Sequence, residues 1–92
     1  MDGCGMNITW RKRSGVFPEL ASRACDNGSK EVGELYCVEK VLRLGMLKAT
    51  YEYNIYHWLE SDKWEADVVS PHGWHGLDND ELNRILLELN IV

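Results

Sequence analysis

The stretch from Lys48 to Leu59 reads KATYEYNIYHWL, and its apolar side chains recur at alternate positions. A period of two is typical of a half-buried strand, because successive side chains leave the pleat on opposite faces. Tyr56 and Trp58 fall on the second face, among polar neighbours, and are predicted to stay outside the inner core. The first face is predicted to look into the core, and it carries Ala49, Tyr51, Tyr53, Ile55, His57 and Leu59.

A second alternating run follows a short polar break at residues 60–62. Trp64, Ala66 and Val68 share one face of this run, while its other face carries Lys63, Glu65 and Asp67. Two alternating runs separated by a short polar break are typical of an antiparallel hairpin. The sequence therefore predicts a hairpin as the centre of the fold.

Shorter patterns precede this hairpin. Met6, Ile8 and Trp10 alternate with polar residues and predict a short first strand. Residues 32–47 offer no clean apolar face to a helix, because their charges would point in nearly every direction. We favour a strand there, turning at Gly45 into the central hairpin, with a helix as the alternative.

Two segments are predicted to be helical. Pro18 suits a first helical turn, and small apolar residues at helical spacing extend the pattern over residues 17–26. Asp78 and Glu81 form a capping-box pair before the C-terminal segment. A buried stripe follows at i, i+3, i+4 and i+7, made of Leu82, Ile85, Leu86 and Leu89. Between hairpin and helix, residues 70–76 contain one proline and two glycines and predict a loop without regular structure.

The predicted fold is a single small α+β domain over residues 1–92. It has an antiparallel sheet of three or four strands, a short helix in the N-terminal half, and a C-terminal amphipathic helix packed on one face. A chain of 92 residues can form a modest core without metal or disulfides. Residues 1–5 are a flexible lead if Met6 is the native start.

The net charge of −5 is divided unevenly along the chain. Residues 1–48 carry eight basic and six acidic side chains, whereas residues 49–92 carry two basic and nine acidic ones. Such asymmetry points to a charged partner, although it also serves solubility. Secretory and membrane-spanning patterns are not found, so we expect a cytoplasmic location. Cys4, Cys25 and Cys37 show no paired spacing and predict free thiols.

Catalytic and metal-binding patterns are weak. His72 and His75 are a single pair, whereas structural zinc sites usually have closely spaced ligands at both ends. His57 on the inward strand face is a candidate base beside carboxylates, which leaves a small His/carboxylate enzyme as one alternative. Nucleophile elbows, metalloprotease helices and phosphate-binding glycine loops do not occur. We therefore predict no metal, no cofactor and no enzymatic activity.

Two surfaces are candidates for a macromolecular partner. The first would bind nucleic acid through a basic-aromatic patch of Trp10, Arg11, Lys12 and Arg13, with Tyr56 and Trp58 as a stacking platform. The second would bind a protein, because tryptophan and tyrosine are enriched at interface hot spots and carboxylates steer basic partners. Its predicted residues are Trp58, Trp74, Tyr56, Glu52, Glu65 and Asp67.

The protein-binding surface is our preferred hypothesis. It describes a small acidic inhibitor or regulator that occupies the surface of a basic, nucleic-acid-handling protein by steric and electrostatic competition. Immunity proteins and phage-encoded host-takeover factors act in this way without catalysis. Exposed strand edges and aromatics are also compatible with a homodimer.

Overall fold

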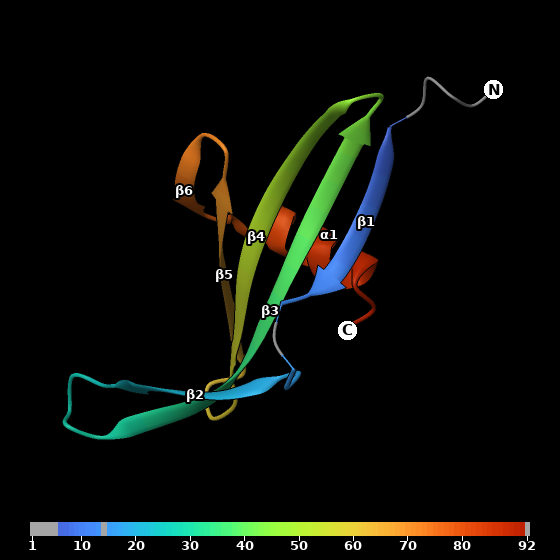
Figure 1. Cartoon of the computed structure of the whole chain (residues 1–92). Coiled ribbons are helices and arrows are strands. Elements are labelled where there is room, and N and C mark those ends of the chain that lie inside the picture. The colour runs from blue at the N-terminus through green and yellow to red at the C-terminus, as the bar shows by residue number, and fades with distance from the viewer. Residues whose placement is uncertain (1–5, 14, 92) are drawn as a thin grey trace.

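The computed structural model describes residues 6–13 and 15–91, so the proposed lead at residues 1–5, with Cys4, lies outside the described part. The described part forms one antiparallel sheet and one helix, and the helix packs on one face of the sheet (Figure 1). The elements are β1 (Asn7–Lys12), β2 (Glu19–Ala24), β3 (Lys30–Leu44), β4 (Leu47–Trp58), β5 (Lys63–Ser70), β6 (Gly73–Gly76) and α1 (Asn79–Glu88).

β3 organises the sheet because it is long enough to pair with two strands along one edge. Its second half pairs with β1, and its first half pairs with β2. Its other edge pairs with β4, which in turn pairs with β5, and β5 pairs with β6. β2 and the start of β3 consequently project as an arm from the end of the sheet (Figure 1).

The predicted central hairpin is confirmed. β4 and β5 pair antiparallel, from Glu52 opposite Val69 to Trp58 opposite Lys63. The preference for a strand over residues 32–47 is also confirmed, since β3 runs to Leu44 and turns at Gly45 into β4. The first strand is present as β1.

The predicted helix over residues 17–26 is wrong, because Glu19–Ala24 is the strand β2. Its residues pair one by one with the first half of β3, from Glu19 opposite Leu35 to Ala24 opposite Lys30. Leu20, which would have been central to a buried helical stripe, is 85% exposed. Pairing with an open strand edge outweighs the weak helical propensity of this segment.

The sheet also has more strands than the predicted three or four, since residues 6–13 and 15–91 contain six. One of the additional strands lies in residues 70–76, where no regular structure was expected. Pro71 and His72 form a two-residue turn, and Ser70 pairs with Gly73 across it. Gly73 adopts a φ of 120°, a conformation that side chains with a Cβ rarely allow. The glycine therefore permits the turn that starts β6.

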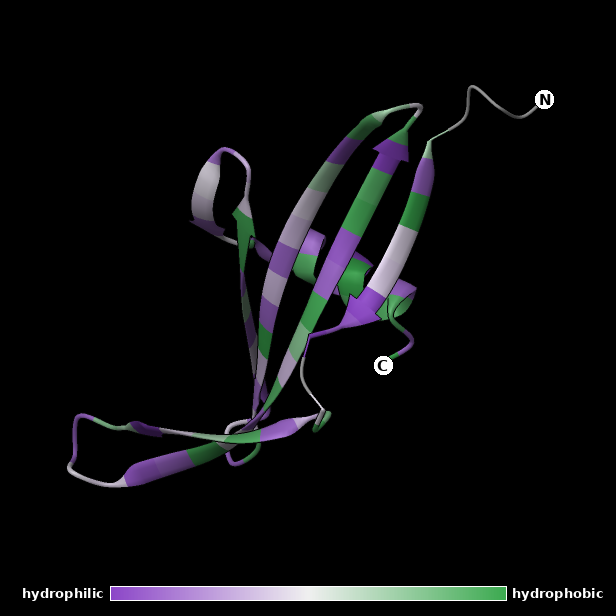
Figure 2. Cartoon of the chain, viewed as in Figure 1, coloured by the Kyte–Doolittle hydropathy of each residue, from purple (hydrophilic) through white to green (hydrophobic). Residues whose placement is uncertain are grey.

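The core lies between α1 and the face of the sheet predicted to look inward. Ile55 and Tyr53 of β4 are 0% and 5% exposed, and they belong to a cluster with Val38, Ala66, Val68, Leu82, Ile85 and Leu86. Asp78 accepts a hydrogen bond from the Glu81 backbone N–H, and the Glu81 side chain accepts one from the Asp78 N–H. The capping box and the buried leucine stripe of the last helix are thus confirmed. Figure 2 shows the alternation of polar and apolar bands along the long strands.

Candidate protein-interaction surface

Opposite α1, the sheet presents a helix-free face made of the even positions of β4 and the odd positions of β5. Cross-strand pairing places Tyr56 beside Glu65, and Glu52 beside Val69. Val69 in turn lies opposite Trp74 of β6. All six residues predicted for partner binding therefore lie on the helix-free face, although they differ in exposure.

Trp58 is buried rather than presented to a partner, with only 4% of its surface exposed. The Tyr56 ring stacks on it at 5.5 Å between centroids, and the Arg23 guanidinium lies 4.1 Å from the indole centroid. Gly33, its cross-strand neighbour, leaves room for the ring, since a Cβ there would lie 2.6 Å from Trp58 Cε3. The prediction of Trp58 as an exposed anchor is wrong, because the β2–β3 arm covers it.

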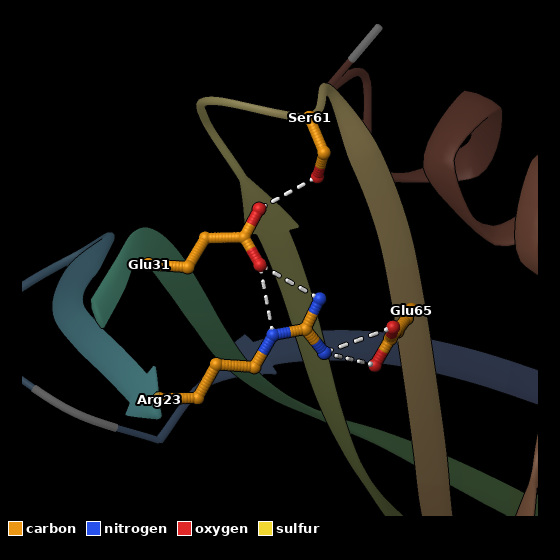
Figure 3. A network of polar contacts seen from close by, with 4 residues as sticks. All are labelled: Arg23, Glu31, Ser61 and Glu65. Carbon is orange, nitrogen blue, oxygen red and sulfur yellow. Dashed lines mark hydrogen bonds and ion pairs between the residues drawn. The ribbon is translucent and has the colours of Figure 1, made fainter. Parts of the chain in front are cut away.

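An ionic network fixes that arm to the rest of the sheet (Figure 3). Arg23 of β2 donates to Glu31 Oε1 from Nε at 3.0 Å, and its Nη1 donates to Glu65 of β5 at 3.1 Å. The Ser61 hydroxyl, in the β4–β5 turn, donates to Glu31 Oε2 at 2.7 Å. We call Arg23, Glu31, Ser61 and Glu65 the arm clamp.

The arm clamp changes the electrostatics of its members. The Ser61 hydroxyl and the Arg23 guanidinium hold the pKa of the Glu31 carboxyl below its ordinary value. Hydrogen bonds to Glu31 and Glu65 raise the pKa of Arg23. Glu65, predicted as a rim charge for a partner, is therefore already matched by an internal cation. The arm clamp was not predicted, because residues 17–26, which include Arg23, were expected to form a helix.

Asp67 belongs to a second network on the helix-free face. It accepts a hydrogen bond from Asn54 Nδ2 at 3.0 Å, and Asn54 Oδ1 accepts one from Arg13 at 2.6 Å. Arg13 also donates to the backbone oxygens of Val38 and Tyr53. Glu52, in contrast, makes no ion pair with any residue in the ranges 6–13 and 15–91.

Trp74 is the aromatic side chain that this face leaves open. It is 66% exposed, and its neighbour Val69 is 41% exposed. Because β6 is the last strand of the sheet, no further strand within the described ranges shields the indole. Sequence reasoning identified Trp74 but missed Val69, which looked like part of an ordinary strand.

The four residues of the alternative nucleic-acid patch do not share one surface. Trp10 and Lys12 lie on the helix side of the sheet, where Trp10 packs on Tyr53 at 5.4 Å and Lys12 lies over Phe17. Arg11 points to the opposite side and pairs with Glu39. Arg13 is held by the hydrogen bonds to Asn54 and the backbone. The alternation of a strand thus divides a motif that is continuous in sequence.

The histidines and the two described cysteines differ in their contacts and exposure. His57 stacks on Trp64 at 4.0 Å, and its Nε2 lies 2.7 Å from Asp62 Oδ1. Cys25 and Cys37 are free thiols, and burial raises the pKa of Cys37. His72 and His75 are exposed in the β5–β6 turn and on β6. Within the described residues, no three His, Cys, Asp or Glu side chains gather closely enough to hold a metal ion.

Comparisons with known proteins return no relative: no family model, curated protein or solved structure matches the chain. The described part of the chain contains no helix of the length and apolarity needed to span a bilayer.

Proposed function

We propose that the protein is a small cytoplasmic binding module that engages a basic protein through the Trp74 edge of its helix-free face. The observation that carries this proposal is the open indole of Trp74 beside the exposed Val69, on the same face as Glu52 and Asp67. Large aromatic side chains that remain exposed on a rigid strand are typical interface anchors.

The carboxylates around this anchor determine which partners fit. Glu52 has no internal cation within the described residues, so its charge is available to a partner. Asp67 is oriented by Asn54 and contributes a positioned acceptor. A basic surface, such as the groove of a nucleic-acid-handling protein, complements this arrangement, and the bound module would block access to it. This mechanism needs no catalytic group and suits an inhibitor or regulator of the immunity or host-takeover kind.

The test is affinity capture from the native cell, followed by titration of the purified partner. Trp74→Ala is expected to weaken binding by at least about thirtyfold, since hot-spot truncations cost roughly 2 kcal/mol or more. Glu52→Gln is expected to reduce the association rate and its dependence on salt.

Leu20→Ala is the matched control, because Leu20 is an exposed apolar residue on the distant arm. Its affinity should equal that of the wild type. A partner that binds Trp74→Ala as tightly as the wild type would show that this edge is not the binding site.

A further inference from the structure

The end of the sheet formed by β1 and the β3–β4 turn is apolar on its helix side but lies beyond the core. Met46, in the turn, is fully exposed at 102%, and Leu47 and Ile8 are 72% and 50% exposed. A shallow open hollow of about 190 Å³ lies at this end and is lined by Met6, Leu42, Leu44, Leu47, Lys48 and Ala49. We call this end the distal tip, and its apolar members are Met6, Ile8, Leu42, Leu44, Met46, Leu47 and Ala49.

The opposite side of the distal tip is cationic. Arg43 and Lys48 lie directly across from each other on β3 and β4. Neither has a carboxylate within ion-pairing distance anywhere in residues 6–13 and 15–91. Like charges that face each other across two strands are destabilising, so folding alone does not account for this pair. An anionic ligand would remove the repulsion.

One group of carboxylates lies at the other end of β4. The arm clamp and Asp62 surround the β4–β5 turn, whereas the distal tip is built on the β3–β4 turn. The twelve residues of β4 separate the two turns by about 40 Å, at roughly 3.3 Å per residue. Residues 40–51 contain three basic and no acidic side chains. The molecule therefore has an apolar, cationic distal tip at one end of β4 and a group of carboxylates around the β4–β5 turn at the other.

We propose that the distal tip binds the surface of an anionic lipid bilayer and inserts Met46 and Leu47 at the headgroup boundary. The long stems of Arg43 and Lys48 reach lipid phosphates while the apolar residues enter the acyl region. An end-on orientation keeps the carboxylates of the β4–β5 turn away from the negative surface. This inference does not rest on the Trp74 edge.

A bilayer fits the distal tip better than a second copy of the chain does. A symmetric end-to-end contact between two tips would bring Arg43 and Lys48 of both copies together without carboxylates to match them. Met46 and Leu47 also protrude at a turn, which suits insertion into a fluid interface more than packing against a flat protein face.

The experiment is vesicle co-sedimentation of the full chain, with phosphatidylcholine alone and with phosphatidylcholine containing phosphatidylserine. The wild type should bind only the phosphatidylserine vesicles, and less tightly as salt is raised. Leu47→Asp should abolish binding. The double variant Arg43→Gln, Lys48→Gln should bind about thirtyfold more weakly, since each basic residue near an anionic surface contributes about 1 kcal/mol.

Leu20→Asp is the matched control, because it places the same charge on an exposed leucine far from the tip. Its vesicle binding should equal that of the wild type. Met46→Asp replaces Leu47→Asp if that variant fails to fold, since the Met46 side chain is fully exposed. Wild-type protein that ignores the anionic vesicles, or binding that survives Met46→Asp and Leu47→Asp, overturns the proposal. Dimerisation that Leu47→Asp abolishes, without vesicle binding, would assign the tip to a second copy instead.

Discussion

At the residue scale, Gly33 determines whether the Trp58 side chain is buried or exposed to a partner. Trp58 has the alternation and the polar neighbours of an exposed strand residue, yet it is buried. The space it occupies exists because Gly33 has no side chain, and Arg23 then covers the ring from the arm. The indole Nε1 has no hydrogen-bond partner within the described ranges, so its burial costs roughly 1–3 kcal/mol.

The first prediction concerns this contact. Gly33→Ala should lower the free energy of unfolding by about 1–3 kcal/mol, because an added Cβ would meet Trp58 Cε3 at 2.6 Å and the His57 backbone oxygen at 2.8 Å. Gly76→Ala is the control, since a Cβ at Gly76 has open space around it. Urea titration followed by tryptophan fluorescence measures both. Equal stabilities of the two variants would show that Trp58 does not pack against Gly33.

A second prediction concerns the reactivity of a thiol. Burial raises the pKa of Cys37, and the thiolate is the form that reacts with alkylating agents. Iodoacetamide should therefore modify Cys37 more slowly in the folded protein than in the same protein unfolded in urea. Site-resolved mass spectrometry measures the two rates. Similar rates in both states would mean that the thiol is open to solvent.

At the element scale, the elements that were predicted correctly are those whose patterns are local. β4 and β5 alternate strictly, and α1 combines a capping box with a leucine stripe. β2 has no such pattern and forms because the first half of β3 offers it an edge. β6 depends on the two-residue turn at Pro71 and His72. One proline and two glycines in residues 70–76 predicted a loop there instead of a strand. Tertiary pairing of this kind is not encoded in a short window of sequence.

The third prediction tests the packing of α1. Leu86→Ala should lower the free energy of unfolding by about 2–5 kcal/mol, because Leu86 is 2% exposed in the core. Leu87→Ala is the matched control, since Leu87 is the next residue of the same helix and 68% exposed. That variant should remain within about 0.5 kcal/mol of the wild type. Thermal and urea unfolding both measure the difference. A loss of stability in Leu87→Ala as large as in Leu86→Ala would show that α1 packs on the sheet through a different face.

The fourth prediction concerns the arm clamp and pH. The folded state holds the pKa of Glu31 below its ordinary value of 4.5, mainly through Ser61 and then Arg23. The stabilisation is therefore complete above that value and is lost as the pH falls through the lower, folded pKa. The unfolding temperature should fall on acidification in the wild type. Glu31→Gln should be less stable near neutral pH and lose less stability in acid.

Glu60→Gln is the control for the arm clamp, because Glu60 is exposed in the neighbouring turn. This variant should retain the acid dependence of the wild type. Parallel stability curves for Glu31→Gln and the wild type would show that the arm clamp contributes nothing to the acid transition.

At the scale of the whole molecule, the fold is elongated, with extents of 56 × 27 × 25 Å, and residues from both halves of the sequence meet at the β4–β5 turn, where Arg23 and Glu31 contact Ser61 and Glu65. The long β3–β4 pairing carries residues 40–51 away from the acidic β4–β5 turn. Of the predicted partner-binding residues, Trp74 and Glu52 remain available, while Trp58 and Glu65 are engaged internally. The alternation placed Glu52, Trp58 and Glu65 on the correct face of the hairpin, whereas Trp74 was expected in a loop. The alternation did not predict that β2, which is distant in sequence, covers Trp58.

The last prediction links the stability of the whole fold to the distal tip. Lys48→Glu should stabilise the fold by about 0.2–1 kcal/mol, because it replaces a like-charge pair across β3 and β4 with an attractive one to Arg43. The same substitution should abolish binding to phosphatidylserine vesicles. Lys30→Glu is the control, because this substitution changes the net charge equally and Lys30 lies opposite the uncharged Ala24. If Lys48→Glu is less stable than the wild type, Lys48 stabilises the folded state and the proposed repulsion from Arg43 is wrong. Greater stability together with lost vesicle binding is typical of a residue retained for a ligand.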